Sequence, residues 1–302
     1  GIANDGTTIG QTVIDGVMRA VTWQPDGAMI LLDMSNDPSI SSQAVWGNSN
    51  GRCLGNTWQT GSPDSKTNAL WQDGMQLTEG LPASYAEPGT YIGSINDNGF
   101  MVGEVAQTAA RWTGEQLELL PVQPGYAGGG ARALHEDGTA AGTVWQLPGY
   151  QGIPAPFVWG VDGSVRVLES STAYIPAEMN RFRVYWVDEN GGLVANALQN
   201  GLQPDYLVRY SDGTQTPIAD LSGEGATLTG ANAAGTLVGH ALLGGIPVPT
   251  IWVNDQPSML ADLIVPGPDR LLTAVYAIND SGMMVGDAQD SAGTVYSVLL
   301  NP

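Results

Sequence analysis

The chain has 302 residues, of which 30 are acidic and 10 basic, so its formal net charge is −20 at pH 7. A negative surface of this strength repels phosphate backbones and anionic membranes, so nucleic acid and membranes are not expected partners. No apolar stretch approaches the roughly 18 residues of a membrane span. Cys53 is the only cysteine, which excludes an intrachain disulfide and a thiolate metal cluster.

A short motif recurs along the whole chain: Gly, three residues and a second Gly, the third of the three usually branched and apolar. The mean spacing of about 46 residues is typical of one structural repeat per copy. The seven copies are residues 6–10, 51–55, 99–103, 138–142, 191–195, 235–239 and 282–286, with Ala195 in place of the second Gly in the fifth.

Small polar residues precede the first Gly of each motif, as in 96–99 (Asn-Asp-Asn-Gly) and 279–282 (Asn-Asp-Ser-Gly). Asn and Asp bond their own backbone, and Gly adopts the left-handed conformation that a side chain resists. Apolar residues flank these turns on both sides. The pattern therefore predicts a hairpin of a first and a second strand in every repeat.

A third predicted strand follows the second Gly and ends in an aromatic residue in most repeats. A turn such as 162–163 (Asp-Gly) then leads to a fourth strand. We expect the aromatic to fill the wedge between neighbouring units rather than to serve as a stacking platform for a ligand. The residues assigned to this slot are Trp23, Trp71, Trp112, Trp159 and Trp252, with Arg209 in the fifth repeat and Tyr296 in the seventh.

Four strands per repeat predict an all-β protein, a β-propeller of about seven four-stranded blades, with six or eight as the alternatives. The first repeat lacks most of its first strand, and the seventh stops after its third. We expect a single domain over residues 1–302. Its predicted repeats are 1–41, 42–85, 86–125, 126–178, 179–222, 223–268 and 269–302.

The repeat resembles the bacterial extracellular HAF family, whose unit reads Ile-Asn-Asp-x-Gly-x-x-Val-Gly before a strand ending in Trp. Residues 95–103 and 278–286 match it best. The His-Ala-Phe triplet that names the family is absent, and 155–157 (Ala-Pro-Phe) comes nearest. The resemblance implies a repeat protein of bacterial envelopes or secretions and transfers no catalytic residue.

The residue directly after the second motif position is polar in every repeat, within an otherwise apolar or small strand. Repeat symmetry would place the seven copies on one ring around a propeller axis. They then either face water or form a ligand-binding site at the axis. The seven are Gln11, Asn56, Glu104, Thr143, Asn196, His240 and Asp287.

Few residues support catalysis or metal binding. His135 and His240 are the only histidines, and no Gly-x-Ser-x-Gly elbow accompanies them. No His-x-x-x-His or EF-hand pattern occurs, so no cofactor is expected. Calcium at acidic turns, above all 188–191 (Asp-Glu-Asn-Gly), is the one metal that the sequence suggests.

The first functional hypothesis is a non-catalytic binding or scaffolding propeller, secreted or on a bacterial cell surface, that presents loops to a glycan or protein partner. A monomer is expected. The alternative is a polysaccharide hydrolase or lyase at the axial mouth, in which His240 meets Glu104 or Asp287. The longest insertions, 59–68, 146–156 and 170–183, predict where the binding face is elaborated.

Overall fold

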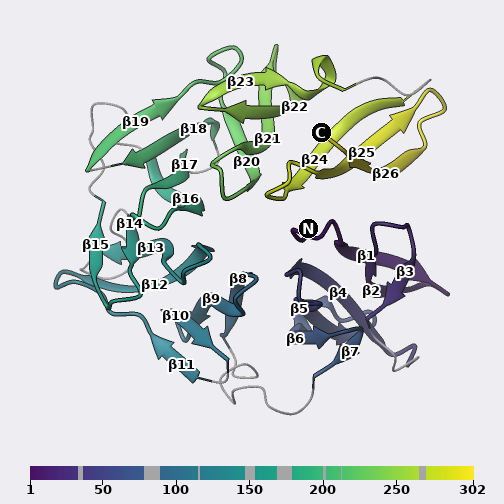
Figure 1. The fold of residues 1–302 in the computed structure, drawn as a ribbon, viewed down its shortest axis with the longest axis horizontal. Helices are drawn as coiled ribbons and strands as arrows, with labels where there is room; N and C mark the ends of the chain where they lie inside the picture. The colour runs from purple at the N-terminus through teal and green to yellow at the C-terminus, as the bar shows by residue number, and fades with distance from the viewer. Residues whose placement is uncertain are drawn as a thin grey trace. The chain divides into compact units, whose positions relative to one another are not determined.

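The computed structural model describes residues 1–302 except 33–36, 78–88, 115, 147–153, 169–178, 200–201, 212 and 265–269. The chain divides into two compact units, Gly1–Leu120 and Pro121–Pro302. Figure 1 labels their strands. Among the described residues no helix is long and apolar enough to cross a membrane.

The first unit contains three antiparallel sheets, in which every strand pairs with its neighbour in the chain. A 3-10 turn, η1 (Pro63–Ser65), precedes the third strand of the second sheet. The sheets are β1 (Thr8–Ile14), β2 (Val17–Trp23) and β3 (Met29–Leu31); β4 (Ile40–Gly47), β5 (Arg52–Gln59), β6 (Thr67–Gln72) and β7 (Met75–Gln76); and β8 (Tyr91–Ile95), β9 (Phe100–Val105), β10 (Thr108–Thr113) and β11 (Gln116–Leu119).

The second unit contains four sheets of the same kind, and η3 (Leu260–Asp262) follows the third of them. They are β12 (Tyr126–Leu134), β13 (Ala140–Gln146), β14 (Ala155–Trp159) and β15 (Val165–Val167); β16 (Met179–Val187), β17 (Leu193–Gln199), β18 (Leu202–Ser211) and β19 (Thr214–Ile218); β20 (Ala226–Ala231), β21 (Leu237–Leu243), β22 (Ile246–Val253) and β23 (Gln256–Met259); and β24 (Arg270–Ile278), β25 (Met284–Asp290) and β26 (Val295–Leu300).

These seven sheets confirm the predicted fold class, an all-β propeller of seven blades. Five sheets have four strands, and the first and the last have three. In the first sheet a single bridge between Ile2 and Thr8 stands where other sheets have a first strand. The last sheet ends with its third strand, β26.

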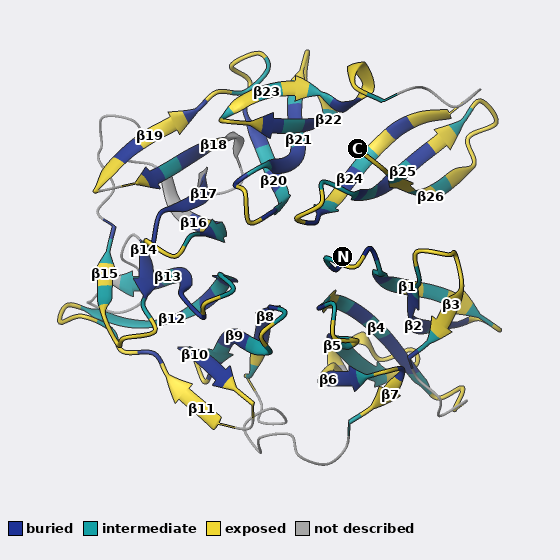
Figure 2. Ribbon diagram, viewed as in Figure 1, coloured by how far each residue is buried: buried dark blue, intermediate teal, exposed yellow. Residues whose placement is uncertain are grey.

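The core of each unit lies between successive sheets, as the dark strands of Figure 2 show. The first strand of a sheet packs on the preceding one, as β16 packs on β12 and β13. Trp23 of the first sheet is half-buried, whereas Trp71, Trp112, Trp159 and Trp252 fill these wedges and are at most 1% exposed. The packing role predicted for them is confirmed, and each buried ring contributes about 2–3 kcal/mol.

Two of these indoles also donate a hydrogen bond to a backbone carbonyl of the second unit. Trp159 Nε1 donates to the carbonyl of Pro121 at 2.7 Å, and Trp252 Nε1 donates to that of Ala219 at 2.8 Å. Ala219 lies just beyond β19, the outer strand of the preceding sheet, and Pro121 is the first residue of the second unit. Trp252 therefore joins the fifth and sixth sheets by a hydrogen bond as well as by burial.

Strand register corrects two of the predicted aromatic slots. In the other sheets the tryptophan stands two residues beyond the partner of the second motif position, as Trp112 follows Ala110. By this register the fifth slot holds Tyr210, which is buried, and the seventh holds Leu300. The loop between the second and third strands varies in length, so counting residues from the motif does not give the strand register. Counting therefore selected Arg209 and Tyr296 in place of the residues at the slot.

The two motif glycines are required for different reasons. Every first Gly has a positive φ, between +72° and +97°, as the turn pattern predicted. The second Gly lies opposite a β-bulge in the first strand, where one extra residue brings the two backbones together. The bulged residues are Val45, Gly93, Arg132, Tyr185, Thr229 and Tyr276.

A side chain at the second Gly would collide with the bulged strand. A Cβ on Gly103 would meet the carbonyl oxygen of Tyr91 closer than 3.0 Å, a separation that real Cβ atoms essentially never show. Gly55, Gly142, Gly239 and Gly286 face the same obstacle. Ala195 shows that the fifth sheet accommodates one methyl group, opposite Val184.

Gly103→Ala is expected to lower the free energy of unfolding by about 2 kcal/mol or more, because the obstacle is backbone and cannot rotate away. Gly10→Ala is the matched control, since its sheet lacks a full first strand and its Cβ would meet only the Trp23 ring, at 3.3 Å. Urea unfolding of both variants measures the difference. Equal losses would contradict the close-approach explanation.

Candidate functional site

The seven predicted ring residues all lie on the second strand of their sheet, or on β1, which takes that role in the first sheet. Their environments differ: Gln11 is exposed, Asn196 is fully buried, and the other five are half-buried. Gln11, Asn56 and Glu104 belong to the first unit and the rest to the second. A ring shared by all seven therefore stays a prediction.

Asn196 bonds two neighbouring sheets of the second unit. Its Nδ2 donates to the carbonyl of Ala226 at 3.2 Å, and its Oδ1 accepts the N–H of Leu228 at 3.4 Å. Both partners lie on β20, the first strand of the next sheet. With no exposed surface, Asn196 supports the packing of the blades and is removed from the candidate ligand contacts.

His240 and Asp287 are not joined by a hydrogen bond or ion pair within the described part of the second unit. The Asp287 carboxylate instead accepts the hydroxyl of Tyr276 at 2.7 Å and that of Ser297 at 3.1 Å. Desolvation, with help from the Asp287 bond and charge, raises the pKa of Tyr276 to about 12. Burial lowers the pKa of His240, which favours the neutral imidazole at pH 7.

A small cavity of about 80 Å³ lies in the first unit, between the second sheet and the first strand of the third. Asn56 is the one predicted ring residue that lines it. Two partly exposed aromatic rings, Trp46 at 37% and Tyr91 at 42%, stand at its rim. The remaining lining residues are Val45, Leu54, Gly55, Asn68, Ala69 and Ile92.

Two amides supply the polar groups of this cavity. Asn56 Nδ2 donates to Asn68 Oδ1 at 3.5 Å, a long bond, and Asn68 Nδ2 donates to the carbonyl of Thr90 at 3.0 Å. Among the described residues Asn56 makes no other side-chain hydrogen bond. Its carbonyl oxygen and second N–H are therefore open to a ligand.

The bulge in β4 builds the cavity. Val45 is the extra residue, opposite Gly55, and both line the space. A bulge redirects the side chains next to it, here Trp46, and the glycine leaves the floor without a side chain. Sequence reasoning found Asn56 but missed Trp46, Asn68 and Tyr91, because their meeting depends on how the second and third sheets pack.

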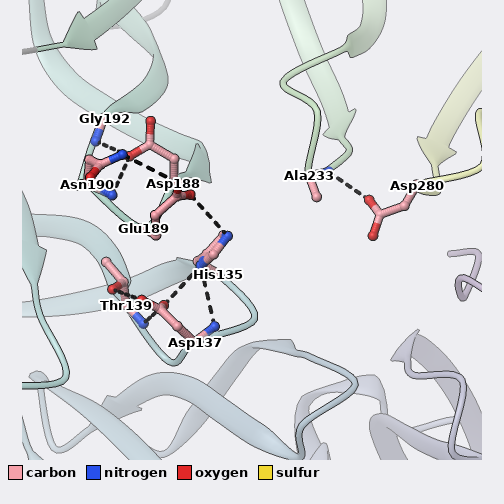
Figure 3. A network of polar contacts seen from close by, with 9 residues as sticks. All are labelled: His135, Asp137, Thr139, Asp188, Glu189, Asn190, Gly192, Ala233 and Asp280. Atoms are coloured by element: carbon pink, nitrogen blue, oxygen red, sulfur yellow. Dashed lines mark hydrogen bonds and ion pairs between the residues drawn. The ribbon is translucent and has the colours of Figure 1, made fainter.

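The predicted acidic turn 188–191 is held by hydrogen bonds to its own backbone (Figure 3). Asp188 Oδ1 accepts the backbone N–H of Asn190 at 2.9 Å and that of Gly192 at 2.7 Å, which occupies its carboxylate within its own turn. Among the described residues no group of three or more His, Cys, Asp or Glu side chains is arranged to hold a metal ion. Calcium at 188–191 stays a sequence-based expectation.

His135 links two turns in the same view. Its Nδ1 lies 3.0 Å from Asp137 Oδ1, and its Nε2 lies 3.6 Å from Glu189 Oε2 in the next sheet. Desolvation raises the pKa of Asp137, but bonds from Thr139 and His135 outweigh it and hold that pKa below its ordinary value. His135 therefore contacts a residue of its own turn and a residue of the turn in the next sheet.

The same two hydrogen bonds join the turns of successive sheets in both units, and we call this pair of bonds the turn clasp. Asn48 Nδ2 donates to the carbonyl of Asn96, and the Ser49 N–H donates to Asp97 at 2.7 Å. The second unit repeats both bonds: Asn232 donates to the carbonyl of Asn279, and the Ala233 N–H donates to Asp280, also at 2.7 Å. The polar residues before the first Gly therefore serve in blade assembly as well as in turn formation.

Of the insertions expected to elaborate a binding face, 59–68 is described and contains η1 and Lys66, whose ammonium lies 5.0 Å from the centre of the Trp58 ring. Most of 146–156 and 170–183 lies outside the described residues.

Comparison with known proteins supports the fold alone. No family model matches the sequence, and no curated protein matches it. Among solved structures, the chain is similar to a post-proline cleaving enzyme from Rickettsia typhi, with a TM-score of 0.61 and 11% identity over 99% of this chain. A prolyl endopeptidase gives a TM-score of 0.61 at 12% identity over 98% of this chain. TolB from Acinetobacter baumannii gives 0.50 at 13% identity over 84%.

The chain is shorter than these proteins. It spans 62% of the TolB chain, 51% of the Rickettsia enzyme and 47% of the prolyl endopeptidase. At such identities the similarity establishes a shared β-propeller architecture, which hosts unrelated activities.

Asn196→Ala is expected to lower the free energy of unfolding by about 2 kcal/mol, because it leaves the Leu228 N–H and the Ala226 carbonyl buried without their partner. Asn56→Ala, at the equivalent position of the second sheet, is the control and should cost under about 0.5 kcal/mol. Thermal and urea unfolding provide the measurement. A neutral Asn196→Ala variant would contradict its assignment as a link between sheets.

Proposed function

We propose that the chain is a non-catalytic binding propeller whose cavity in the first unit recognises a neutral sugar of a glycan. The observation that carries this proposal is the pairing of two partly exposed rings, Trp46 and Tyr91, with the open amide of Asn56. Aromatic faces bury the apolar C–H face of a sugar ring, and an amide offers both a donor and an acceptor to its hydroxyls.

The size of the cavity defines how the ligand lies. About 80 Å³ is far below the 300–1,000 Å³ of a pocket that encloses a drug-sized ligand. One substituent of a sugar ring enters, and the ring itself lies across Trp46 and Tyr91. Binding of this kind is shallow, so several successive sugars of a chain would have to contribute for high affinity.

The charge of the protein selects among glycans. The first unit carries 13 acidic and four basic residues, a net charge of −9. Uronates and sulfated sugars are repelled by such a surface, while neutral and amino sugars are not. A protein partner that displays such a glycan fits the same chemistry.

The bacterial extracellular setting belongs to this proposal. It is supported by the HAF-like units at residues 95–103 and 278–286 and by a function that needs access to surface polysaccharide. On this proposal the protein is secreted or held at the cell surface, acts as a monomer and needs no cofactor.

A glycan array probed with the purified protein, followed by calorimetric titration of the best neutral oligosaccharide, tests the proposal. Trp46→Ala and Asn56→Ala are each expected to weaken binding by ~10-fold or more with little change in the unfolding midpoint. Tyr206→Ala is the control, since Tyr206 is a similarly exposed aromatic, 40% accessible, in the second unit. Binding that survives both cavity variants would overturn the assignment.

The alternative of a hydrolase or lyase is tested in the same experiment. Incubation of the protein with each bound oligosaccharide and analysis of the products should show no cleavage. Reproducible cleavage that is lost in His240→Ala would replace the binding proposal with the enzymatic one. Asp287, one of the two acidic partners considered for His240, is bonded to Tyr276 and Ser297.

A further inference from the structure

The last sheet leaves the outer edge of its third strand without a partner among the described residues. In each of the other six sheets a short outer strand pairs with that edge: β3, β7, β11, β15, β19 and β23. In the seventh, β26 pairs with β25 on one side only. The neighbouring sheets therefore show what kind of element belongs at this place.

Residues of β26 are less buried than their counterparts. Val298 pairs with the second motif glycine, Gly286, and is only partly buried against the core it belongs to. In the other sheets the residue at this position is at most 1% exposed. These counterparts are Val21, Ala69, Ala110, Phe157, Val208 and Thr250. A fourth strand would complete the burial of Val298.

The edge of β26 carries none of the features that protect exposed edges. Its six residues include no charge and no proline, and Val295 and Leu299 are 57% and 39% exposed. The outer strands of the other sheets are two to five residues long, and several contain such features, as Glu118, Arg166 and Pro217 show. Long, uncharged edges bind additional strands.

The backbone of the other sheets defines the register that a strand added to β26 would take. A leucine just past the outer strand donates its N–H to the third strand: Leu120 to Ala109 at 2.8 Å and Leu168 to Pro156 at 2.9 Å. Both leucines are buried. In the seventh sheet the equivalent acceptor is the carbonyl of Ser297. An added strand would therefore place a leucine or isoleucine beside it.

We propose that the open edge of β26 binds an extended segment of a partner protein as a fourth antiparallel strand, and that this segment is basic with a leucine or isoleucine at its end. Backbone hydrogen bonds provide such strand addition, and the pocket for the leucine provides its selectivity. Basic character follows from Asp287 and Asp290 on the adjacent strand and from the 17 acidic and six basic residues of the second unit. A second copy of this chain would be repelled by its net charge of −20.

A synthetic peptide tests the proposal on the full chain: acetyl-Lys-Ser-Val-Arg-Val-Leu-Lys-amide, which is the outer strand segment 164–168 of this protein flanked by lysines. Saturable 1:1 binding is expected by calorimetry, together with slower hydrogen exchange of the Ser297 and Leu299 amides. The same peptide with N-methyl groups on alternate residues should not bind, because it cannot donate the backbone hydrogen bonds.

Two variants separate edge pairing from general charge attraction. Leu299→Lys adds a positive charge to the edge, which repels the basic peptide, and should weaken peptide binding by ~10-fold or more. Leu271→Lys makes the same change on β24, at a residue 65% exposed, and should weaken it by less than ~2-fold.

Equal weakening by both variants, binding of the N-methylated peptide or absence of binding would overturn the proposal. Protection of the two amides before any peptide is added would overturn it as well, since a segment of the same protein would then occupy the edge.

Discussion

The contact between the second motif residue and the bulged first strand is the constraint on which the blades depend. At Gly55, Gly103, Gly142, Gly239 and Gly286 the backbone of the neighbouring strand occupies the space that a side chain would need. The bulge bends the strand, increases its local twist and redirects the side chains next to it. A simple sequence spacing thus controls how one sheet packs on another.

The candidate cavity is a by-product of the same constraint. Val45, the extra residue of the bulge in β4, and Gly55 both line the cavity, and Tyr91 of the next sheet lines it as well. Similar bulges occur in other sheets, where the residue after the bulge is Ser94, Ala133, Trp186, Gly230 or Ala277. Trp186 packs against the core between the fifth and sixth sheets, so a tryptophan after a bulge does not by itself line a cavity.

The repeat predicted the number of sheets, the left-handed turn glycines and the buried tryptophans, because each follows from local backbone chemistry or from a periodic pattern. It failed for the aromatic slot of the fifth sheet, where strand register selects Tyr210 over Arg209. It also treated Asn56 and Asn196 as equivalent. One lines a cavity and the other is buried against β20, a difference that arises from packing between sheets and leaves no local signal.

Every described strand pairs with a strand adjacent to it in the chain, and the repeated turn clasps join consecutive sheets. One further bond, from Asn4 Nδ2 to Asp97 Oδ2, joins the turns of the first and third sheets. Chains with such short-range topology need little loop-closure entropy before their contacts form, so folding is able to start in any blade and spread to its neighbours. Contacts between neighbouring sheets therefore contribute much of the stability of each unit, so a substitution at one junction is expected to affect mainly the two sheets that meet there.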